Sequence, residues 1–479
     1  MIALQNHLPR LRVPWVPIGR WPTPLTALDL ERSETEGGDP DGSTRGARGS
    51  APCRIERSEA AGGDPYDSPG AAWGRAPRGI ERSETEGGDP DGSTRGARGR
   101  VPRGIERSEA AAEAPDRSAG GAGGRLPRGI HRSETGAGDP DGSAGGAGAR
   151  GPRGLAGAPV WVKHEGDAHP EYGGNKVRTL EVWLGHARAV GARRIWAIGA
   201  YGSNHAVATV LHAPRAGLEG AAIVFPQPIS AWAVENCRAL IASGCPLIRL
   251  RSVIGVPLAA WRVARRERDA VVMPPGGATA IGTFGALAAA FELADQIAAG
   301  LAPPPRRIVL AVGSTCTAAG LVAGLELARA IGLWRWPVPI VHGVRVTPWP
   351  VTSRVRTAEL ARRTLVRVER LGGPPVAIGL AGLIGRLVID GRELGPGYGR
   401  STPQCDAAMR ALHGPECPRL DAVYSGKAAA ALLRLHRAGV GPLLFWASKS
   451  SATLRAPADE VLRNAPPAIA RWLRRAEDR

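Results

Sequence analysis

The stretch RRIWAIG (193–199), followed by SNHAVATVLHAPRAG (203–217), decides the fold. The first segment is a short apolar run typical of a buried strand, and the second carries apolar residues at helical spacing. The same pair recurs when GAAIVF (220–225) precedes AWAVENCRALIASG (231–244). Strands separated by single helices require crossover connections, so the sequence predicts an α/β fold with doubly wound layers around mostly parallel sheets.

Composition bounds the class of protein. The chain has 479 residues, of which 43% are hydrophobic, and this supplies a substantial core for two or three domains. Its six cysteines form no C-x-x-C pair, which argues against a metal or redox site and fits a reducing cytoplasm. No run approaches the roughly 18 apolar residues that a membrane-spanning helix needs. We therefore expect a soluble, cytoplasmic protein.

A repeat with a period of 25 residues interrupts the chain. Its units, such as IERSETEGGDPDGSTRGARG, begin at positions 30, 55, 80, 105 and 130. Each unit offers a single Leu or Ile and little else that is apolar, so the sequence predicts a disordered insertion over 30–157. A folded array and an Arg/Gly-rich nucleic-acid segment are the alternatives, but residues 31–150 hold 18 Arg against 21 acidic residues.

The net charge of +18 therefore comes from the rest of the chain, where the segments read as helices and strands. A positive field of this kind suits an anionic cofactor and anionic substrates. We expect no nucleic-acid partner, because the repeats are not net basic and have almost no stacking aromatics.

Three glycine-rich segments follow predicted strands, where ligands bind in such folds. They are GAYGSNHAVATV (199–210), PPGGATAIGTFG (274–285) and VGSTCTAAGLVAGL (312–325). In the third segment, small and hydroxyl residues open a helix, so backbone N–H groups and the helix dipole could hold a phosphate. An ordinary strand-to-helix turn made of small residues remains the alternative.

Lys176 is the residue with the clearest chemical prediction. The chain uses 58 arginines and only four lysines, yet a lysine stands directly behind Gly173, Gly174 and Asn175. An imine with an aldehyde needs a primary amine that can lose its proton, which a guanidinium cannot do. The alternative is an ordinary lysine in the first turn of a helix that Asn175 caps.

The segment GGNKVRTLE (173–181) resembles the Schiff-base lysine motif of fold type II pyridoxal-phosphate enzymes, the tryptophan synthase β-like superfamily. The resemblance is strongest to its D-cysteine desulfhydrase and 1-aminocyclopropane-1-carboxylate deaminase group. Other matches follow in that group's order: WPTPLTAL, VWVKHEG, GSNHA, PPGGATAIGTFG, GSTCTAAGL, LGPGYGRSTP, DAVYSGKAAAALL and PLLFW. Apart from the repeats, they span nearly the whole chain.

The resemblance implies roles for individual residues. Lys176 would carry pyridoxal 5′-phosphate as a Schiff base and then act as general base. The remaining implied residues are Ser203 (substrate carboxylate or proton relay), Asn204 and His205 (cofactor ring), Gly313, Ser314, Thr315, Cys316 and Thr317 (phosphate), Tyr398 and Tyr424 (substrate) and Ser448 (pyridine nitrogen). A helix cap with a packed histidine, and core tyrosines, are the structural alternatives.

The resemblance also implies a domain plan: an arm over 1–29, a large cofactor-binding domain over 158–178 and 291–479, and a small α/β domain over 179–290. A homodimer with a small amino-acid substrate is expected.

Departures from the group's pattern bear on the reaction. Ser425 follows the second tyrosine where the deaminases have glutamate, which favours β-elimination like that of D-cysteine desulfhydrase, giving a keto acid and ammonia. Gly202 replaces a glutamine, and Lys449 and Ser450 replace two glycines in FWASKSSA (445–452). Ring-opening deamination, or a cofactor-binding protein with weakened catalysis, are the alternatives.

Overall fold

The computed structural model describes residues 1–28, 30, 159–414, 417–455 and 458–477. Except for Leu30, the predicted repeat insertion over 30–157 lies outside the described residues, so its disorder stays a prediction.

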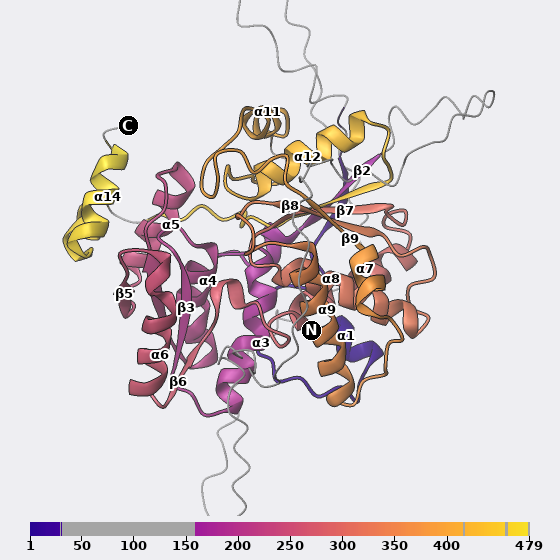
Figure 1. Cartoon of the computed structure of the whole chain (residues 1–479), viewed down its shortest axis with the longest axis horizontal. Helices are drawn as coiled ribbons and strands as arrows, with labels where there is room; N and C mark the ends of the chain where they lie inside the picture. The colour runs from indigo at the N-terminus through magenta and orange to yellow at the C-terminus, as the bar shows by residue number, and fades with distance from the viewer. Residues whose placement is uncertain (29, 31–158, 415–416, 456–457, 478–479) are drawn as a thin grey trace, which may run out of the picture. The chain divides into compact units, whose positions relative to one another are not determined.

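A six-stranded sheet forms the larger core, in the order β1-β2-β10-β7-β8-β9 (Figure 1). Its strands are β1 (Leu25–Leu28), β2 (Val160–His164), β7 (Arg307–Val312), β8 (Ile340–Arg345), β9 (Leu387–Asp390) and β10 (Leu443–Ala447). Only the edge pair β1 and β2 is antiparallel, and the other described neighbours run parallel. The segment before the repeats thus pairs directly with the segment after them.

Helices cover both faces of this sheet. On one face lie α7 (Phe284–Ala298), α8 (Cys316–Ala330) and α9 (Arg354–Arg370), with α1 (Ile2–His7) against α7. On the other lie α11 (Pro403–Ala411) and α12 (Ser425–Arg437), while α10 (Leu380–Gly385) leads into β9. Helices α7 and α8 approach closely, because a Cβ on Gly320 would lie 2.5 Å from the Thr283 carbonyl oxygen.

A four-stranded parallel sheet forms the second core, in the order β5-β4-β3-β6. Its strands are β3 (Arg194–Ala200), β4 (Glu219–Phe225), β5 (Leu247–Arg249) and β6 (Ala270–Val272). Helices α3 (Asn175–Ala189), α4 (Asn204–His212) and α5 (Ala231–Ala242) pack on one face, and α6 (Val256–Arg266) packs on the other. Layers of helix, sheet and helix around mostly parallel strands confirm the predicted α/β class.

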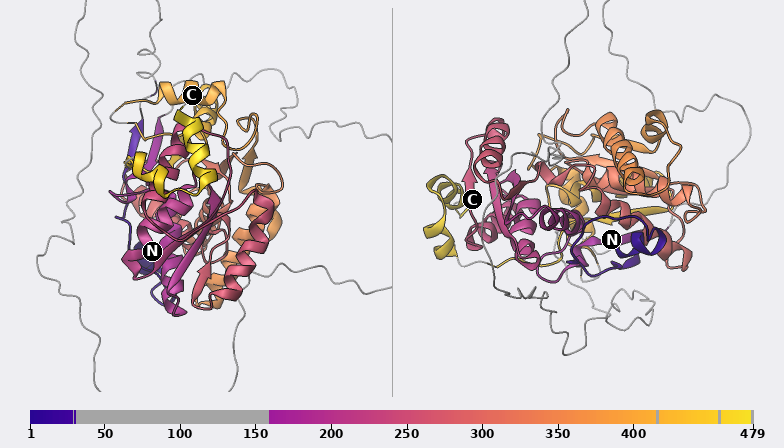
Figure 2. Two further views of the ribbon diagram at one scale, coloured as in Figure 1. Left: turned by 90° about the vertical axis from the view of Figure 1, so that its left-hand side faces the viewer. Right: turned by 90° about the horizontal axis from the view of Figure 1, so that it is seen from below.

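The remaining elements are short or C-terminal. Helices α13 (Ala458–Asn464) and α14 (Pro467–Glu477) contact α5, and Figures 1 and 2 show α14 beside it. The described residues also contain four 3₁₀ helices: η1 (Glu165–Ala168), η2 (Ala213–Ala216), η3 (Val253–Gly255) and η4 (Pro275–Gly277). Within the described ranges, no helix is both long and apolar enough to cross a membrane.

A buried ionic network fixes the start of α3. The Lys163 ammonium on β2 lies 2.5 Å from a Glu292 carboxylate oxygen on α7. Arg178, two residues after Lys176, binds Glu165 at 2.7 Å and Glu292 at 3.0 Å. Thr23 from the N-terminal arm joins through its hydroxyl and carbonyl groups. Each buried charge therefore has an opposite partner, and the network ties the arm, β2, α3 and α7 together.

Candidate active site

Lys176 lies in the first turn of α3, behind a glycine pair that the backbone requires. Gly174 has φ +94°, a conformation that side chains other than glycine rarely adopt, and a Cβ there would lie 2.8 Å from the Ser448 carbonyl oxygen. A Cβ on Gly173 would lie 2.0 Å from the Gly166 carbonyl oxygen. The two glycines therefore let the loop before α3 pack tightly between η1 and the end of β10.

The Lys176 amine meets two of the other predicted segments. A Cβ on Gly276, in η4, would lie 3.6 Å from Lys176 Nζ and 2.3 Å from Ser314 Oγ. The lysine, the 274–285 segment and the 313–317 turn thus converge on one point. Burial lowers the pKa of Lys176, and no acidic side chain among the described residues pairs with it. A larger share of this amine is therefore unprotonated and nucleophilic than in an exposed lysine.

The turn over 313–317 joins β7 to α8. Thr315 has φ +69°, and its buried hydroxyl has no hydrogen-bond partner among the described residues. It also occupies the N-cap position of α8 without capping the helix through its side chain. Thr317 is bound by a residue at the start of α3, because Asn175 Nδ2 donates a hydrogen bond to its Oγ1 at 2.9 Å. Unpaired donors at the start of a 15-residue helix favour an anion such as phosphate.

The residues predicted around the cofactor ring open α4. Ser203 caps the helix, with its Oγ accepting a hydrogen bond from the Ala206 N–H at 3.3 Å. Asn204 Oδ1 accepts hydrogen bonds from Tyr172 Oη at 2.8 Å and from Asn236 Nδ2 at 2.7 Å. The structure therefore gives Ser203 the capping role that was its structural alternative, and it fixes the orientation of Asn204.

His205 is the group in this turn with unused hydrogen-bonding capacity. It is buried, and neither ring nitrogen has a partner among the described residues. Burial lowers the pKa of His205 to about 3, and the nearby Lys176 adds to the shift. The imidazole is thus neutral and lies close to the lysine, which suits contact with a ring or a polar group of a bound molecule.

Tyr398 and Tyr424 form a hydroxyl pair. Their oxygens are 2.9 Å apart, and their rings meet edge to face at 6.1 Å. Tyr424 also faces the predicted phosphate turn, because its Cε1 would lie 3.3 Å from a Cβ on Gly313. Burial raises the pKa of both phenols, so both stay protonated at neutral pH and can donate or relay a proton.

Both tyrosines line a small cavity of about 10 Å³ together with Asn204, Asn236 and Lys449. A larger cavity of about 570 Å³ shares Gln227 with it and is lined by Arg400, Ser401 and Trp472 from other elements. The two cavities are therefore neighbours, and the larger one provides room beside the tyrosine pair.

The segment after β10 packs on the lysine loop. The Ser448 carbonyl accepts a hydrogen bond from the Asn175 N–H at 3.3 Å, and Ser450 Oγ accepts one from the Gly173 N–H at 2.9 Å. Ser450, which departs from the group's glycine, thus stabilises the loop that carries Lys176. Lys449 points the other way, into the small cavity. The sequence identifies Lys449 only as a departure from the group's glycine, although it is one of just four lysines in the chain.

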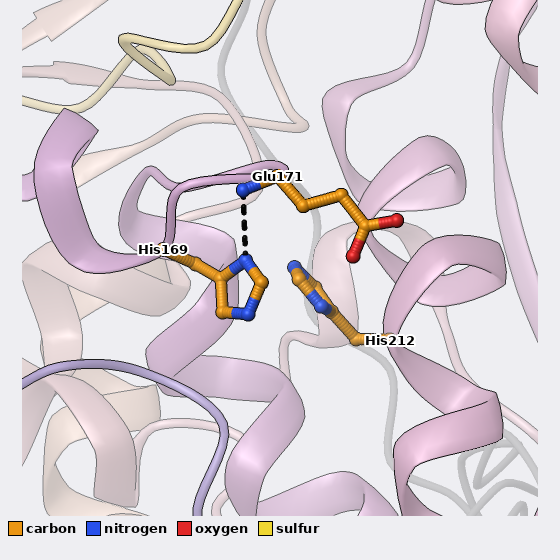
Figure 3. A group of neighbouring side chains, drawn as sticks. All are labelled: His169, Glu171 and His212. Atoms are coloured by element: carbon orange, nitrogen blue, oxygen red, sulfur yellow. Dashed lines mark hydrogen bonds between the residues drawn. The ribbon is translucent and has the colours of Figure 1, made fainter. Parts of the chain in front are cut away.

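A cluster that sequence reasoning missed lies just before the lysine loop. Figure 3 shows His169, Glu171 and His212, whose potential metal-binding atoms lie within 4.8 Å of one another. Each already has a protein partner: His169 Nδ1 accepts the Glu171 N–H at 3.1 Å, and His212 Nε2 donates to the Tyr172 carbonyl at 2.8 Å. The Glu171 carboxylate pairs with Arg215 at 3.0 Å. The cluster therefore orders the loop, and we assign it no metal.

Comparison with known proteins identifies the family. Residues 149–441 match the model of the family described as pyridoxal-phosphate dependent enzyme. The chain belongs to this family. A nocardicin C-9′ epimerase from Nocardia uniformis subsp. tsuyamanensis is 33% identical over 66% of this pyridoxal-phosphate dependent enzyme and 92% of the relative. A D-cysteine desulfhydrase from Yersinia pestis is 28% identical over 60% of this chain and 86% of the relative.

A further relative and a solved structure support the same family. A putative 1-aminocyclopropane-1-carboxylate deaminase from Pyrococcus horikoshii is 30% identical over 59% of this chain and 81% of the relative. The crystal structure of an ACC deaminase homologue matches with a TM-score of 0.51 and 28% identity, covering 65% of this chain and 90% of the homologue. The resemblance drawn from the motifs is therefore confirmed, as are fold type II and pyridoxal phosphate as the cofactor.

The residues present fit this cofactor. Lys176, whose pKa is lowered, lies beside Gly276 and Ser314. Ser314 leaves no room for a side chain at position 276. The orphaned Thr315 hydroxyl at the start of α8 matches the needs of a phosphate, and the neutral His205 ring lies near the lysine. The amine suits the aldehyde of pyridoxal phosphate, the anion site suits its phosphate, and the unpaired imidazole suits contact with its ring.

Proposed function

We propose that this pyridoxal-phosphate dependent enzyme catalyses β-elimination on a small amino acid, giving a keto acid and ammonia as a D-cysteine desulfhydrase does. The observation that carries the proposal is the Lys176 amine, which has a lowered pKa and lies beside the Gly276 and Ser314 segments. Relatives named D-cysteine desulfhydrase and 1-aminocyclopropane-1-carboxylate deaminase support the reaction class.

The roles of the residues follow from their chemistry. Lys176 would hold the cofactor through its amine, and residues 313–317 would hold its phosphate. When bound, pyridoxal phosphate supplies an electron sink at the substrate's α-carbon. Once the substrate amine has displaced Lys176 from the cofactor, the freed and unprotonated Nζ would accept the α-proton, and the Tyr398 and Tyr424 hydroxyls, 2.9 Å apart, would pass a proton toward the leaving group. Asn204 orients the bound molecule from the start of α4.

Borohydride trapping tests the attachment. The purified holoenzyme should show a visible absorbance band that reduction removes, and mass spectrometry should find the reduced cofactor on the peptide of Lys176. Lys163, Lys427 and Lys449 are the internal controls, because the chain has no other lysines. Lys176→Arg keeps a long basic side chain but cannot form the bond, so this variant should lack the band. A band that survives in Lys176→Arg would contradict the assignment.

Product analysis tests the reaction. The holoenzyme should release keto acid and ammonia from at least one of D-cysteine, L-cysteine, D-serine or β-chloroalanine, and Lys176→Arg should not. Keto acid from the cyclopropane amino acid would instead identify ring-opening deamination. If the band is present but none of these compounds reacts, the protein binds its cofactor without acting as a lyase.

Epimerisation is a second candidate, favoured by the 33% identity to nocardicin C-9′ epimerase. It shares the removal of the α-proton by Lys176 but returns a proton to the opposite face, for which the tyrosine pair offers a donor. Exchange of the α-hydrogen for deuterium with inversion, and without keto acid, separates epimerisation from elimination.

Assembly and location complete the proposal. We propose a homodimer, supported by exposed apolar side chains on η3 and α6: Val253, Ile254, Leu258 and Trp261. A cytoplasmic location is supported by five free cysteines among the described residues. The domain plan, with a small domain over 179–290, also stays a proposal. Light scattering on the purified protein tests the dimer.

A further inference from the structure

Lys449 is a buried lysine that the proposed reaction leaves unused. It follows β10 directly, and only 3% of its surface is exposed. Its side chain lines the small cavity that also contains Asn204 and the tyrosine pair, Tyr398 and Tyr424. The amine therefore lies within the same pocket as the residues proposed to handle the substrate.

The carboxylates nearest to Lys449 are already engaged. Asp421 Oδ1 accepts the N–H groups of Val423 and Tyr424 at 2.9 and 2.7 Å, and its Oδ2 accepts the Ser425 hydroxyl at 3.1 Å. Glu235 binds Arg419 at 2.9 Å and also accepts the Leu454 N–H at 2.8 Å. No hydrogen bond or ion pair of Lys449 Nζ is found in the described part of the chain.

Aromatic rings take the place of a counterion. Lys449 Nζ lies 5.8 Å from the ring centroid of Tyr172 and 5.8 Å from that of Trp232. Contacts of this kind attract a cation but do not replace a hydrogen-bonded anion. Burial lowers the pKa of Lys449, although Asp421 and Glu235 oppose the shift. A buried ammonium is costly without a partner, so an anionic group entering the cavity would stabilise it.

The cavity has a second feature that favours negative charge. Gly202 and Asn204, at the start of α4, line it together with Lys449 and with Asp421, whose carboxylate oxygens are taken up by hydrogen bonds. The dipole of α4 and its first N–H groups favour a carboxylate at that end. The small cavity, at about 10 Å³, has room for one small polar group beside Lys449, and the neighbouring cavity of about 570 Å³ shares Gln227 with it. A substrate whose α-carboxylate lies at the start of α4 and whose side chain reaches Lys449 would carry two anionic ends.

We propose that Lys449 binds a carboxylate on the side chain of the substrate, so that the enzyme prefers amino acids with a second carboxylate over their neutral counterparts. This inference rests on the proposed function, since it assigns the α-carbon to the chemistry of Lys176. It names a specificity-determining residue at the position where the family resemblance shows only a departure.

Matched substrate pairs test the proposal on the holoenzyme. Aspartate with asparagine, and glutamate with glutamine, in both configurations, differ only in the charge of the side chain. Titration of each into the wild type should show the acidic member of at least one pair binding about tenfold more tightly. Lys449→Met, which keeps the length of the chain but not the charge, should abolish that preference, and Lys449→Arg should restore part of it. Arg262→Met removes one exposed charge on α6 and should leave the preference unchanged.

Three outcomes would overturn the proposal. The first is no preference in the wild type, and the second is the same preference in Lys449→Met. The third is an equal loss of both members of a pair, which would make Lys449 a ligand of the α-carboxylate instead. The cofactor band in Lys449→Met reports that the variant is folded and loaded, and Lys449→Arg keeps the test decisive if that band is lost.

Glutarate separates this inference from the proposed function. It carries two carboxylates and no amine, so its binding does not depend on turnover. Binding of glutarate that Lys449→Met weakens would support the anion site even if no keto acid were released by any substrate. If keto acid is released but Lys449→Met does not change the binding of glutarate, the result would support the lyase and overturn the anion site.

Discussion

Asn175 Nδ2 donates a hydrogen bond to Thr317 Oγ1 at 2.9 Å. The bond joins the residue before Lys176 to the last residue of the proposed phosphate turn, across 142 positions of sequence. The amine and the anion site are thus positioned relative to each other by a direct contact, as well as by the helices that carry them.

Breaking this contact should loosen cofactor binding. We expect Asn175→Ala and Thr317→Val each to weaken the affinity for pyridoxal phosphate by about tenfold, because either change removes one hydrogen bond between the two segments. The double variant should be no weaker than the worse single one, and fluorescence titration measures all three. Additive losses would show that the two residues act independently.

Replacing Thr315 with glycine should raise the stability of the apoprotein and lower its affinity for the cofactor. Its φ of +69° is strained for a threonine, so Thr315→Gly should raise the free energy of unfolding of the apoprotein by about 1 kcal/mol. The same change removes the orphaned hydroxyl and should lower the affinity for the cofactor. Thr315→Ala, which loses the hydroxyl but keeps the strain, should lower affinity without gaining stability. Unchanged affinity in both variants would remove Thr315 from the phosphate site.

Gly276 and Gly191 form a matched pair. Both have positive φ, +68° and +72°, but a Cβ on Gly276 would meet Ser314 Oγ at 2.3 Å, whereas Gly191 has nothing within 4 Å. Alanine at either position should cost about 1 kcal/mol of stability from the backbone alone. Only Gly276→Ala should also abolish the visible absorbance band. Equal bands in the two variants would contradict the convergence of Gly276, Ser314 and Lys176.

The buried network should be sensitive to the loss of one charge. Lys163→Met leaves Arg178 as the one cation paired with Glu292 among the described residues, and we expect a loss of about 3–5 kcal/mol in urea unfolding. Arg193→Met breaks an exposed ion pair with Asp269 and should change stability by less than about 1 kcal/mol. A similar small effect for Lys163→Met would mean that the network is not held by its charges.

Stability should fall in mild acid because of buried histidines. Burial, with His212 nearby, lowers the pKa of His169 to about 4, below the roughly 6.5 of an unfolded histidine. Between these values the unfolded chain binds the proton and the folded chain does not, so stability is lost as pH falls from about 6.5 toward 4, by at most about 1.4 kcal/mol per pH unit for this group. His169→Gln should show a smaller fall between pH 7 and pH 5 in urea unfolding midpoints. An identical fall in both proteins would contradict this role.

Local sequence patterns were sufficient for the class of fold. The runs at 193–199 and 220–225 become β3 and β4, because continuous apolar residues followed by a helix are what a buried parallel strand requires. The order of strands was not readable, since β2 and β10 are neighbours although 278 residues lie between them. Such pairings depend on the packing of the whole chain.

The candidate site also contains residues with a local sequence signal and residues without one. The glycine pair and the small residues after β7 have local geometric causes, so the sequence alone was enough to select Lys176 and residues 313–317 as candidates. The environment of Lys449 depends on Tyr172, Trp232 and Glu235 from distant segments, and no local pattern reveals that its neighbouring acids are engaged elsewhere.

The antiparallel pair of β1 and β2 has a consequence for the history of the gene. Leu28 lies opposite Val160, so the residues on either side of the connecting segment are held side by side at one edge of the sheet. The entropy of closing a connection rises only with the logarithm of its length, so lengthening this connection costs little free energy. Duplications of the coding repeat at this point should therefore change the stability of the two sheets little. The same position is a suitable site for inserting a fluorescent reporter by genetic fusion.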